Sequence, residues 1–314
     1  MIKAESIRTV FMGTPEFALP PLEGLIAAGV NLVGVYTQPD RPKGRGKKLA
    51  ASPVKQLALE HNIPVFQPDK LRDPQAVEEL QTLQPDLIIV VAYGQILPKV
   101  ILDMPQYNCI NIHASLLPKY RGAAPINKAI VDGETETGVT TMLMDVGLDT
   151  GDMLVKRSVS IGENETAGQL HDRLAVLGRE VLDETLRLLC AGELVAEKQD
   201  DALSCYAPMM KKEDGLIVWQ KSAQEIHNQV RGLDPWPGTY THLDGDVLKI
   251  AATTVCEKSG EPGTILSADK GGVLVACGEG SVLIGELQLP GKKRLAAVNF
   301  LSGRPLFTGT KLPS

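Results

Sequence analysis

The sequence predicts an α/β protein of two domains, a larger one built on a mostly parallel sheet and a smaller antiparallel β domain. At 314 residues the chain exceeds the size at which a single hydrophobic core usually keeps growing. Through the first 190 or so residues, apolar strand-like runs alternate with helical patterns; from about Ala207 short β-branched runs follow, separated by Gly, Asp and Pro. We therefore place the larger domain at 1–190, a linker at 191–208 and the smaller domain at 209–314.

The elements of the larger domain follow from these patterns in chain order. Short apolar runs bounded by turn residues predict strands over 7–12, 31–36, 86–92, 109–113 and 139–145. Apolar residues that recur with helical spacing predict helices over 16–28, 53–61, 74–83, 125–132 and 167–191. Because ligands of an open α/β sheet bind beyond the carboxyl ends of its strands, polar groups at those ends are the first candidates for a site.

The smaller domain is predicted to be a small antiparallel barrel or sandwich. Its strands are expected over 247–252, 263–267, 272–277 and 281–287. Residues 209–314 carry 12 Lys and Arg against 11 Asp and Glu, so this is the more cationic domain. Three of its cations follow a Pro-Gly turn and are expected on a loop: Lys292, Lys293 and Arg294. A Greek-key barrel with basic loops is a common nucleic-acid platform, although an ordinary solvated β domain fits the same pattern.

Composition argues against several classes of protein. Charged residues make up 22% of the chain and no window of 18 apolar residues occurs, so nothing is expected to span a membrane. The first predicted strand begins too early to leave room for a signal or transit peptide, and we expect a cytoplasmic protein. Five scattered cysteines without a C-x-x-C pair predict neither a disulfide framework nor a metal site. A net charge of -6 argues against coating nucleic acid through the overall field.

A local basic patch, here called the basic arm, occupies residues 38–48 with the sequence Q-P-D-R-P-K-G-R-G-K-K. Its glycines and prolines predict a segment without regular secondary structure. A solvated surface loop is the simpler interpretation, but the length and composition also suit an arm that becomes ordered on contact with phosphates. The cations of the arm are Arg41, Lys43, Arg45, Lys47 and Lys48.

Gly13-Thr14-Pro15 follows the first predicted strand and provides a tight turn, a hydroxyl for a helix N-cap and a proline at the first helical position. A helix N-terminus of this kind can receive an anion, but a structural turn explains the residues equally well. The segment lacks the second and third glycines of the G-x-G-x-x-G fingerprint. We therefore do not expect NAD.

The most informative stretch is N-I-H-A-S-L-L-P-K-Y-R-G-A-A-P at 111–125, which ends an apolar run with two polar groups. Alternate residues of a strand face the same side, so the amide of Asn111 and the imidazole of His113 would stand side by side where the strand stops. Taken singly, each is explained by a turn cap or by a satisfied, half-buried histidine. Their pairing beside the constrained Ser115–Pro118 loop instead indicates a catalytic site for an oxygen that becomes negatively charged.

A second stretch, M-D-V-G-L-D-T-G-D at 144–152, packs three carboxylates into a glycine-rich loop. Because Asp in a turn usually bonds its own backbone, we choose only Asp149 to face a pocket. Amide, imidazole and carboxylate together provide what acyl transfer needs, namely oxyanion donors and a group that relays a proton from an attacking amine. Ser115 lacks a G-x-S-x-G elbow, which argues against a serine hydrolase and favours direct transfer from donor to acceptor.

These two stretches resemble the folate-dependent formyltransferases, and the similarity runs through nearly the whole chain. It extends to F-M-G-T-P-E-F, T-Q-P-D-R-P-K-G-R-G-K-K-L, V-V-A-Y-G-Q-I-L-P and D-P-W-P-G, which begin at residues 11, 37, 90 and 234. The resemblance implies a Rossmann-like domain that binds 10-formyltetrahydrofolate and performs the transfer, and an OB-like barrel that helps to hold tRNA. It also implies the acceptor, the free α-amino group of initiator methionyl-tRNA, which is formylated for translation initiation.

The resemblance also implies roles for individual residues. Carried over by motif, Asn111, His113 and Asp149 are the catalytic residues. The folate site is implied to be lined by Ser115, Leu116, Leu117 and Pro118. The arm bearing Arg45 is implied to enter the acceptor-stem end of the tRNA, and we expect the other cations of the arm and of the 292–294 loop to contact tRNA as well. Asp234 departs from the family's pattern, in which Asn precedes P-W-P.

Other interpretations remain open at this point. A glycinamide-ribonucleotide formyltransferase shares N-x-H and the distal Asp but is a shorter, one-domain chain without the basic arm, and a nucleotide-sugar formyltransferase also lacks the arm. A formyl-folate hydrolase would use the same three residues with water as acceptor. A non-catalytic RNA-binding protein would explain the barrel and the arm but not the three intact residues. We expect a monomer, because no long apolar heptad predicts a coiled-coil dimer.

Overall fold

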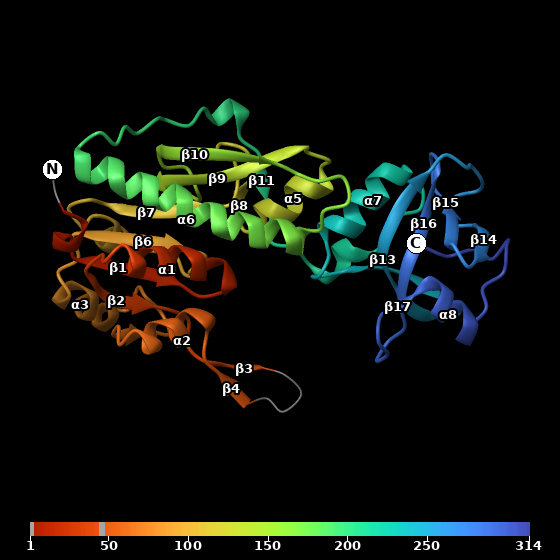
Figure 1. Ribbon diagram of the computed structural model, residues 1–314, viewed down its shortest axis with the longest axis horizontal. Helices are drawn as coiled ribbons and strands as arrows, with labels where there is room; N and C mark the ends of the chain where they lie inside the picture. Colours follow the sequence, from red (N-terminus) through yellow and green to blue (C-terminus); the bar gives the residue numbers. More distant parts are fainter. Residues whose placement is uncertain (1–2, 44–47) are drawn as a thin grey trace. The chain divides into compact units, whose positions relative to one another are not determined.

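The computed structural model describes residues 3–43 and 48–314, in which the chain forms two compact units (Figure 1). Unit 1 consists of Met1–Gly122, Thr137–Val159 and His171–Tyr206, and unit 2 of Ala123–Glu136, Ser160–Leu170 and Ala207–Ser314. The domain boundaries expected from the sequence stay a prediction. Within the described ranges, no helix is both long enough and apolar enough to cross a membrane.

The described part of unit 1 is built on a mostly parallel sheet with the strand order β10-β9-β7-β6-β1-β2-β5. Strand β1 pairs parallel with β2 and β6, β2 with β5 and β6 with β7, whereas β7 pairs antiparallel with β9. The strand bounds are Thr9–Gly13 (β1), Leu32–Tyr36 (β2), Val65–Phe66 (β5), Leu87–Val91 (β6), Cys109–His113 (β7), Glu136–Leu143 (β9) and Met153–Ser160 (β10).

All five strands predicted for this sheet are confirmed. Strands β1 and β6 are buried along their whole length, which is why they stand out as continuous apolar runs. Strand β5 was missed because it has two residues. Strand β10 was missed because its second half, including Lys156 and Arg157, is largely exposed and breaks the apolar pattern.

The predicted helices of the larger domain are also confirmed. Their bounds are Leu19–Ala27 (α1), Pro53–Glu60 (α2), Pro74–Thr82 (α3), Pro125–Val131 (α5) and Ala167–Ala191 (α6), with a short additional helix at Lys99–Leu102 (α4). The segment before α1 forms a 3-10 turn, Glu16–Ala18. A Cβ added at Gly178 of α6 would lie 3.4 Å from Ile112, so this residue of β7 faces α6. Asn111 and His113 alternate with Ile112 and face the other side of the sheet.

The basic arm contains a regular element, so its prediction as an irregular segment was wrong. Arg41–Lys43 (β3) pairs antiparallel with Lys48–Ala50 (β4) in a two-stranded ribbon. Pro42 is tolerated there because both strands of such a ribbon are edge strands, where a backbone N–H can be lost without breaking a central ladder. Arg45 and Lys47, which were predicted to contact tRNA, lie outside the described residues.

Unit 2 contains an antiparallel sheet with the order β12-β13-β16-β15-β14, and β17 pairs with β16. The bounds are Thr239–Leu243 (β12), Asp246–Cys256 (β13), Ile265–Asp269 (β14), Gly272–Ala276 (β15), Ser281–Gln288 (β16) and Leu295–Ala296 (β17). Helices α7 (Ala223–Gly232) and α8 (Ala297–Gly303) belong to unit 2. The short strands β8 (Arg121–Gly122) and β11 (Tyr206–Ala207) form a two-stranded sheet of their own. The predicted fold class, a Rossmann-like sheet domain followed by a smaller antiparallel β domain, is confirmed.

The core of unit 2 explains why its sheet forms. Trp219, Ile250 and Ile284 are buried in one apolar cluster that also includes residues of α7 and α8. Helix α7 was not predicted from the sequence, although Ser222 and Glu225 have the spacing of a capping box. In the structure Ser222 accepts from the backbone of Glu225, and the carboxylate of Glu225 accepts from Ser222.

The close approach of β9 and β10 leads to a stability prediction. A Cβ at Gly138 would lie 2.1 Å from the backbone oxygen of Arg157, which cannot move without disturbing the sheet. We expect Gly138→Ala to lower the free energy of unfolding by about 3 kcal/mol, measured by urea denaturation. Gly303→Ala is the matched control, because nothing lies within 4 Å of a Cβ there. Equal effects of the two substitutions would contradict the described packing.

Candidate functional site

Asn111 and His113 lie toward the carboxyl end of β7, beside β6. The backbone of Asn111 pairs with Val90 on one side and Met142 on the other, so its position is fixed by the sheet. Its side chain is half-buried, and its amide has no hydrogen-bond partner among the described residues. The amide is therefore available to donate to a ligand.

His113 is buried, with 6% of its surface exposed, and the structure determines the roles of its two ring nitrogens. Its Nε2 lies 2.9 Å from the backbone oxygen of Tyr120. Because a carbonyl oxygen only accepts, Nε2 must carry a hydrogen and donate. The other nitrogen, Nδ1, lies 3.7 Å from Oδ2 of Asp149, which is too long for a hydrogen bond. Nδ1 therefore stands beside a carboxylate without being bonded to it.

Asp149 lies beside His113, with its Oδ2 3.7 Å from Nδ1 of the imidazole. Its Oδ2 accepts from the backbone N–H of Gly122 at 2.9 Å, and its other carboxylate oxygen has no hydrogen-bond partner among the described residues. Asp145 behaves differently, since it accepts from Thr150 and from the backbone of its own loop. The structure therefore brings Asp149 to His113 and uses Asp145 to shape the turn.

The loop between β9 and β10 is held by a residue that the sequence patterns did not single out. The side-chain N–H of Gln199 donates to the backbone oxygens of Asp149 at 2.8 Å and of Gly151 at 2.7 Å. Its Oε1 accepts from Arg121 at 2.9 Å, and Arg121 also pairs with Asp201. Asp149 needs this support because its φ of 54° lies in the left-handed region, which is unfavourable for a residue with a side chain. In the sequence, the one residue of this hydrogen-bond network that was part of a noted motif is Arg121, in the 111–125 stretch.

Hydrogen bonds to Lys119 and to Thr140 fix the Ser115–Pro118 loop. The hydroxyl of Ser115 donates to the oxygen of Lys119 at 2.6 Å, and Thr140 of β9 donates to the oxygen of Ser115 at 2.7 Å. Leu117 is buried, and its N–H donates to Thr140. Ser115 and Leu117 therefore hold the loop in place. The members of the loop that stay partly exposed are Leu116 and Pro118.

Cys109 lies on the same strand as the candidate residues but has a structural role. Burial, with a smaller contribution from Asp103, raises the pKa of its thiol to about 12. A thiol with this pKa is neutral near pH 7, so Cys109 is not a nucleophile. In residues 3–43 and 48–314 no cluster of three or more His, Cys, Asp or Glu is arranged to hold a metal ion.

The cations predicted to contact tRNA have different surroundings. Arg41, Lys292 and Lys293 are exposed. Arg294 is paired with Asp234 at 2.5 Å and lies 3.6 Å from Glu286. Its hydrogen bond to Asp234 is the main reason why the pKa of Arg294 is raised. The positive charge of Arg294 is therefore largely offset locally, unlike that of its two neighbours.

Family models match most of the chain. The model described as Formyl transferase covers residues 7–186, and the model described as Formyl transferase, C-terminal domain, covers residues 209–305. The chain belongs to the formyl transferase family, as its resemblance predicted. Similar proteins include the methionyl-tRNA formyltransferases of Geobacter sulfurreducens, 61% identical over 98% of this chain and 96% of the relative, and of Clostridium novyi, 54% identical over 96% and 98%.

Solved structures share the fold at low sequence identity. The sugar 3N-formyl transferase WlaRD, crystallised in the presence of dTDP and 5-N-formyl-THF, has a TM-score of 0.67 and 19% identity over 91% of this chain and 99% of its own. HypX from Aquifex aeolicus in complex with tetrahydrofolic acid has a TM-score of 0.62 and 18% identity over 98% of this chain and 51% of its own. These likenesses agree with the Rossmann-like fold.

Gln199 is predicted to act by positioning Asp149. We expect Gln199→Leu, which removes both hydrogen bonds to the loop, to lower kcat for formyl transfer about 10- to 100-fold and to leave the KM for the formyl donor nearly unchanged. Gln81→Leu is the matched control, since Gln81 is exposed on α3. Steady-state kinetics of the two variants provide the measurement. A Gln199→Leu enzyme with normal kcat would show that the loop does not need this support.

Proposed function

We propose that this chain transfers the formyl group of 10-formyltetrahydrofolate to the α-amino group of initiator methionyl-tRNA, giving N-formylmethionyl-tRNA for translation initiation. Membership of the formyl transferase family supports the reaction type, and relatives of 54% and 61% identity that are methionyl-tRNA formyltransferases support the acceptor. The observation that carries the proposal is the geometry at β7, where Nδ1 of His113 lies 3.7 Å from Asp149 and the amide of Asn111 is unpaired among the described residues.

In this proposal Asn111 donates from its amide to the oxygen that becomes negative when the amine attacks the formyl carbon. His113, when protonated, donates to the same oxygen from Nδ1, because Tyr120 keeps its Nε2 engaged. Asp149 accepts the proton that the amine loses. As the new C–N bond forms and the bond to N10 of the donor breaks, this proton passes to N10. Preorganised donors of this kind typically contribute about 10²- to 10³-fold each in rate.

We propose that the Ser115–Pro118 loop forms one side of the site for the formyl donor. Ser115 and Leu117 do not contact the folate but hold the loop in its conformation, while Leu116 and Pro118 contact the folate. Two exposed apolar side chains support an apolar ligand in this region: Ile96, 90% exposed after β6, and Leu148, 57% exposed next to Asp149. Exposed apolar groups around a polar centre are typical of ligand sites.

We propose that tRNA is bound by residues of both predicted domains, a catalytic domain at 1–190 and a tRNA-binding domain at 209–314, joined by the linker 191–208. The contacts to the phosphate backbone come from the cations of the basic arm and from the 292–294 loop. In that loop Lys292 and Lys293 provide the positive charge that attracts the phosphates, since Arg294 is paired with Asp234. We further propose that the enzyme is a cytoplasmic monomer that uses no metal.

The test of this function is formyl transfer from 10-formyltetrahydrofolate by the purified protein, with rival acceptors assayed in parallel. We expect formylation of initiator methionyl-tRNA, and no product with glycinamide ribonucleotide, with a dTDP-linked amino sugar or with water. His113→Ala, assayed beside the wild type, controls for a contaminating enzyme. Formylation of the sugar would favour the activity of the structural relative WlaRD, and release of formate alone would indicate a hydrolase.

A further inference from the structure

Cys205, an exposed cysteine just before β11, differs from other cysteines of the chain in what its thiol contacts. The thiols of Cys109, Cys256 and Cys277 donate to backbone oxygens of residues no more than 8 positions away. Sγ of Cys205 instead accepts from the backbone N–H of Tyr120 at 3.2 Å, although these two residues are 85 positions apart. The thiol of Cys205 therefore joins two segments that are distant in the sequence.

The segment that ends at Cys205 also holds the residue after Tyr120. The backbone N–H of Arg121 donates to the backbone oxygen of Cys205 at 3.0 Å, and the strands β8 and β11 pair from this point onward. The guanidinium of Arg121 donates to Gln199 at 2.9 Å and to Asp201 at 2.8 Å. Cys205 therefore accepts from two successive backbone N–H groups, at a place where the neighbouring side chain is held as well.

These two hydrogen bonds fix the backbone angles of Tyr120. Its φ of 61° lies in the left-handed region, which a residue with a side chain keeps only when its surroundings enforce it. The thiol of Cys205 binds the peptide group before Tyr120, and the backbone oxygen of Cys205 binds the peptide group after it. Because a peptide group is planar, holding both neighbouring groups sets the two free angles of Tyr120.

The peptide group between Tyr120 and Arg121 connects Cys205 to the imidazole of His113. Its oxygen accepts from Nε2 of His113 at 2.9 Å, and its N–H donates to Cys205. In a planar trans peptide group the C=O and the N–H point in opposite directions, so the bond to Cys205 determines where the oxygen points. Cys205 and His113 therefore hold opposite sides of one peptide group, and a rotation of this group would move the acceptor of Nε2.

The thiol of Cys205 matters more for geometry than for stability. Sulfur is a weak acceptor, so its hydrogen bond adds little to the free energy of unfolding. Because Cys205 is exposed, a water molecule can accept from the N–H of Tyr120 when the thiol is removed. Such a water is not attached to β11, so it satisfies the donor without holding the peptide group. The backbone oxygen of Cys205 is present in every variant and keeps β8 and β11 together.

We propose that Cys205 is a positioning residue for formyl transfer, which holds Tyr120 so that the oxygen of Tyr120 fixes the imidazole of His113. The inference rests on the proposed function, because it assumes that His113 takes part in the transfer. In this proposal Cys205 contacts neither the formyl donor nor the acceptor. It adds a residue of the predicted linker 191–208 to those that determine the rate.

The test compares Cys205→Ala with Cys205→Ser in formyl transfer to methionyl-tRNA by the full-length enzyme. We expect Cys205→Ala to lower kcat about 10-fold and to leave the KM for both substrates unchanged, because a small displacement of a reacting group has effects of this order. Cys205→Ser keeps an acceptor for the N–H of Tyr120 and should restore most of kcat. Cys190→Ala is the matched control with unchanged kcat, since Cys190 is a partly exposed cysteine of unit 1 without a hydrogen-bond partner among the described residues.

The same substitution in a His113→Ala background separates positioning from a merely structural role. Without the imidazole there is nothing for Tyr120 to orient, so Cys205→Ala should cause no further loss in single-turnover rate. An equal loss in both backgrounds, a Cys205→Ser variant as slow as Cys205→Ala, or a Cys205→Ala protein that is slow only because it unfolds in the assay would overturn the inference. So would a normal kcat of Cys205→Ala. In each case formylation by the wild type still stands, and only its absence would overturn the proposed function too.

Discussion

The hydrogen bond from Nε2 of His113 to the backbone oxygen of Tyr120 is the constraint on which the site depends. It fixes the tautomer of the imidazole and leaves Nδ1 as the nitrogen that faces Asp149. Two residues after Tyr120, the N–H of Gly122 donates to the carboxylate of Asp149. Tyr120 and Gly122 both have positive φ angles, 61° and 115°. One short turn therefore orients both the imidazole and the carboxylate, which explains why the motif extends well beyond Asn111 and His113.

Local patterns predicted the parts of the site that depend on local structure. The alternation of side chains along a strand predicted that Asn111 and His113 face the same side. The sheet could be predicted because β1 and β6 are continuous apolar runs. The support of Asp149 was not predictable, because Gln199 reaches it from 50 residues further along the chain. Likewise, the sequence predicted Arg294 as a loop cation that contacts tRNA, and it gave no sign of the ion pair with Asp234, which is 60 residues away. Contacts at such separations leave no periodic signal in a single sequence.

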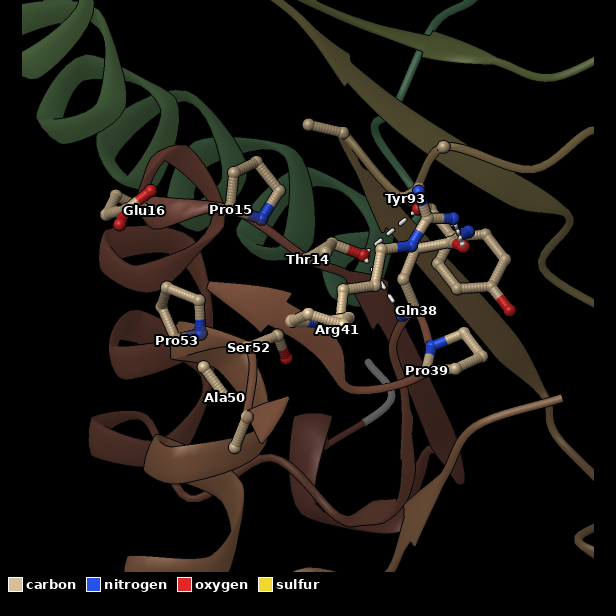
Figure 2. Close-up of a pocket in the computed structure, with 14 residues that line it drawn as sticks. Thr14, Pro15, Glu16, Gln38, Pro39, Arg41, Ala50, Ser52, Pro53 and Tyr93 are labelled. Atoms are coloured by element: carbon tan, nitrogen blue, oxygen red, sulfur yellow. Dashed lines mark hydrogen bonds between the residues drawn. The ribbon is translucent and has the colours of Figure 1, made fainter. Parts of the chain in front are cut away.

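The carboxyl edge of one sheet presents polar groups at β7 and a pocket at β1, β2 and β6 (Figure 2). At β7 several polar groups have fixed partners, and we propose that the amide of Asn111, Nδ1 of His113 and one carboxylate oxygen of Asp149 take part in the reaction. At β1, β2 and β6 the strand ends bond to one another, and the pocket beside them is lined by apolar side chains and Arg41.

The measurement that tests the central claim most directly is a double-mutant cycle of single-turnover formyl transfer with His113→Gln and Asp149→Asn. If the two side chains act as one unit through Nδ1, each single substitution lowers the rate about 10²- to 10³-fold and the double variant is hardly slower than the slower single variant. Losses that multiply in the double variant would mean that the two residues act independently. That result would contradict the joint action of the imidazole and the carboxylate at the end of β7.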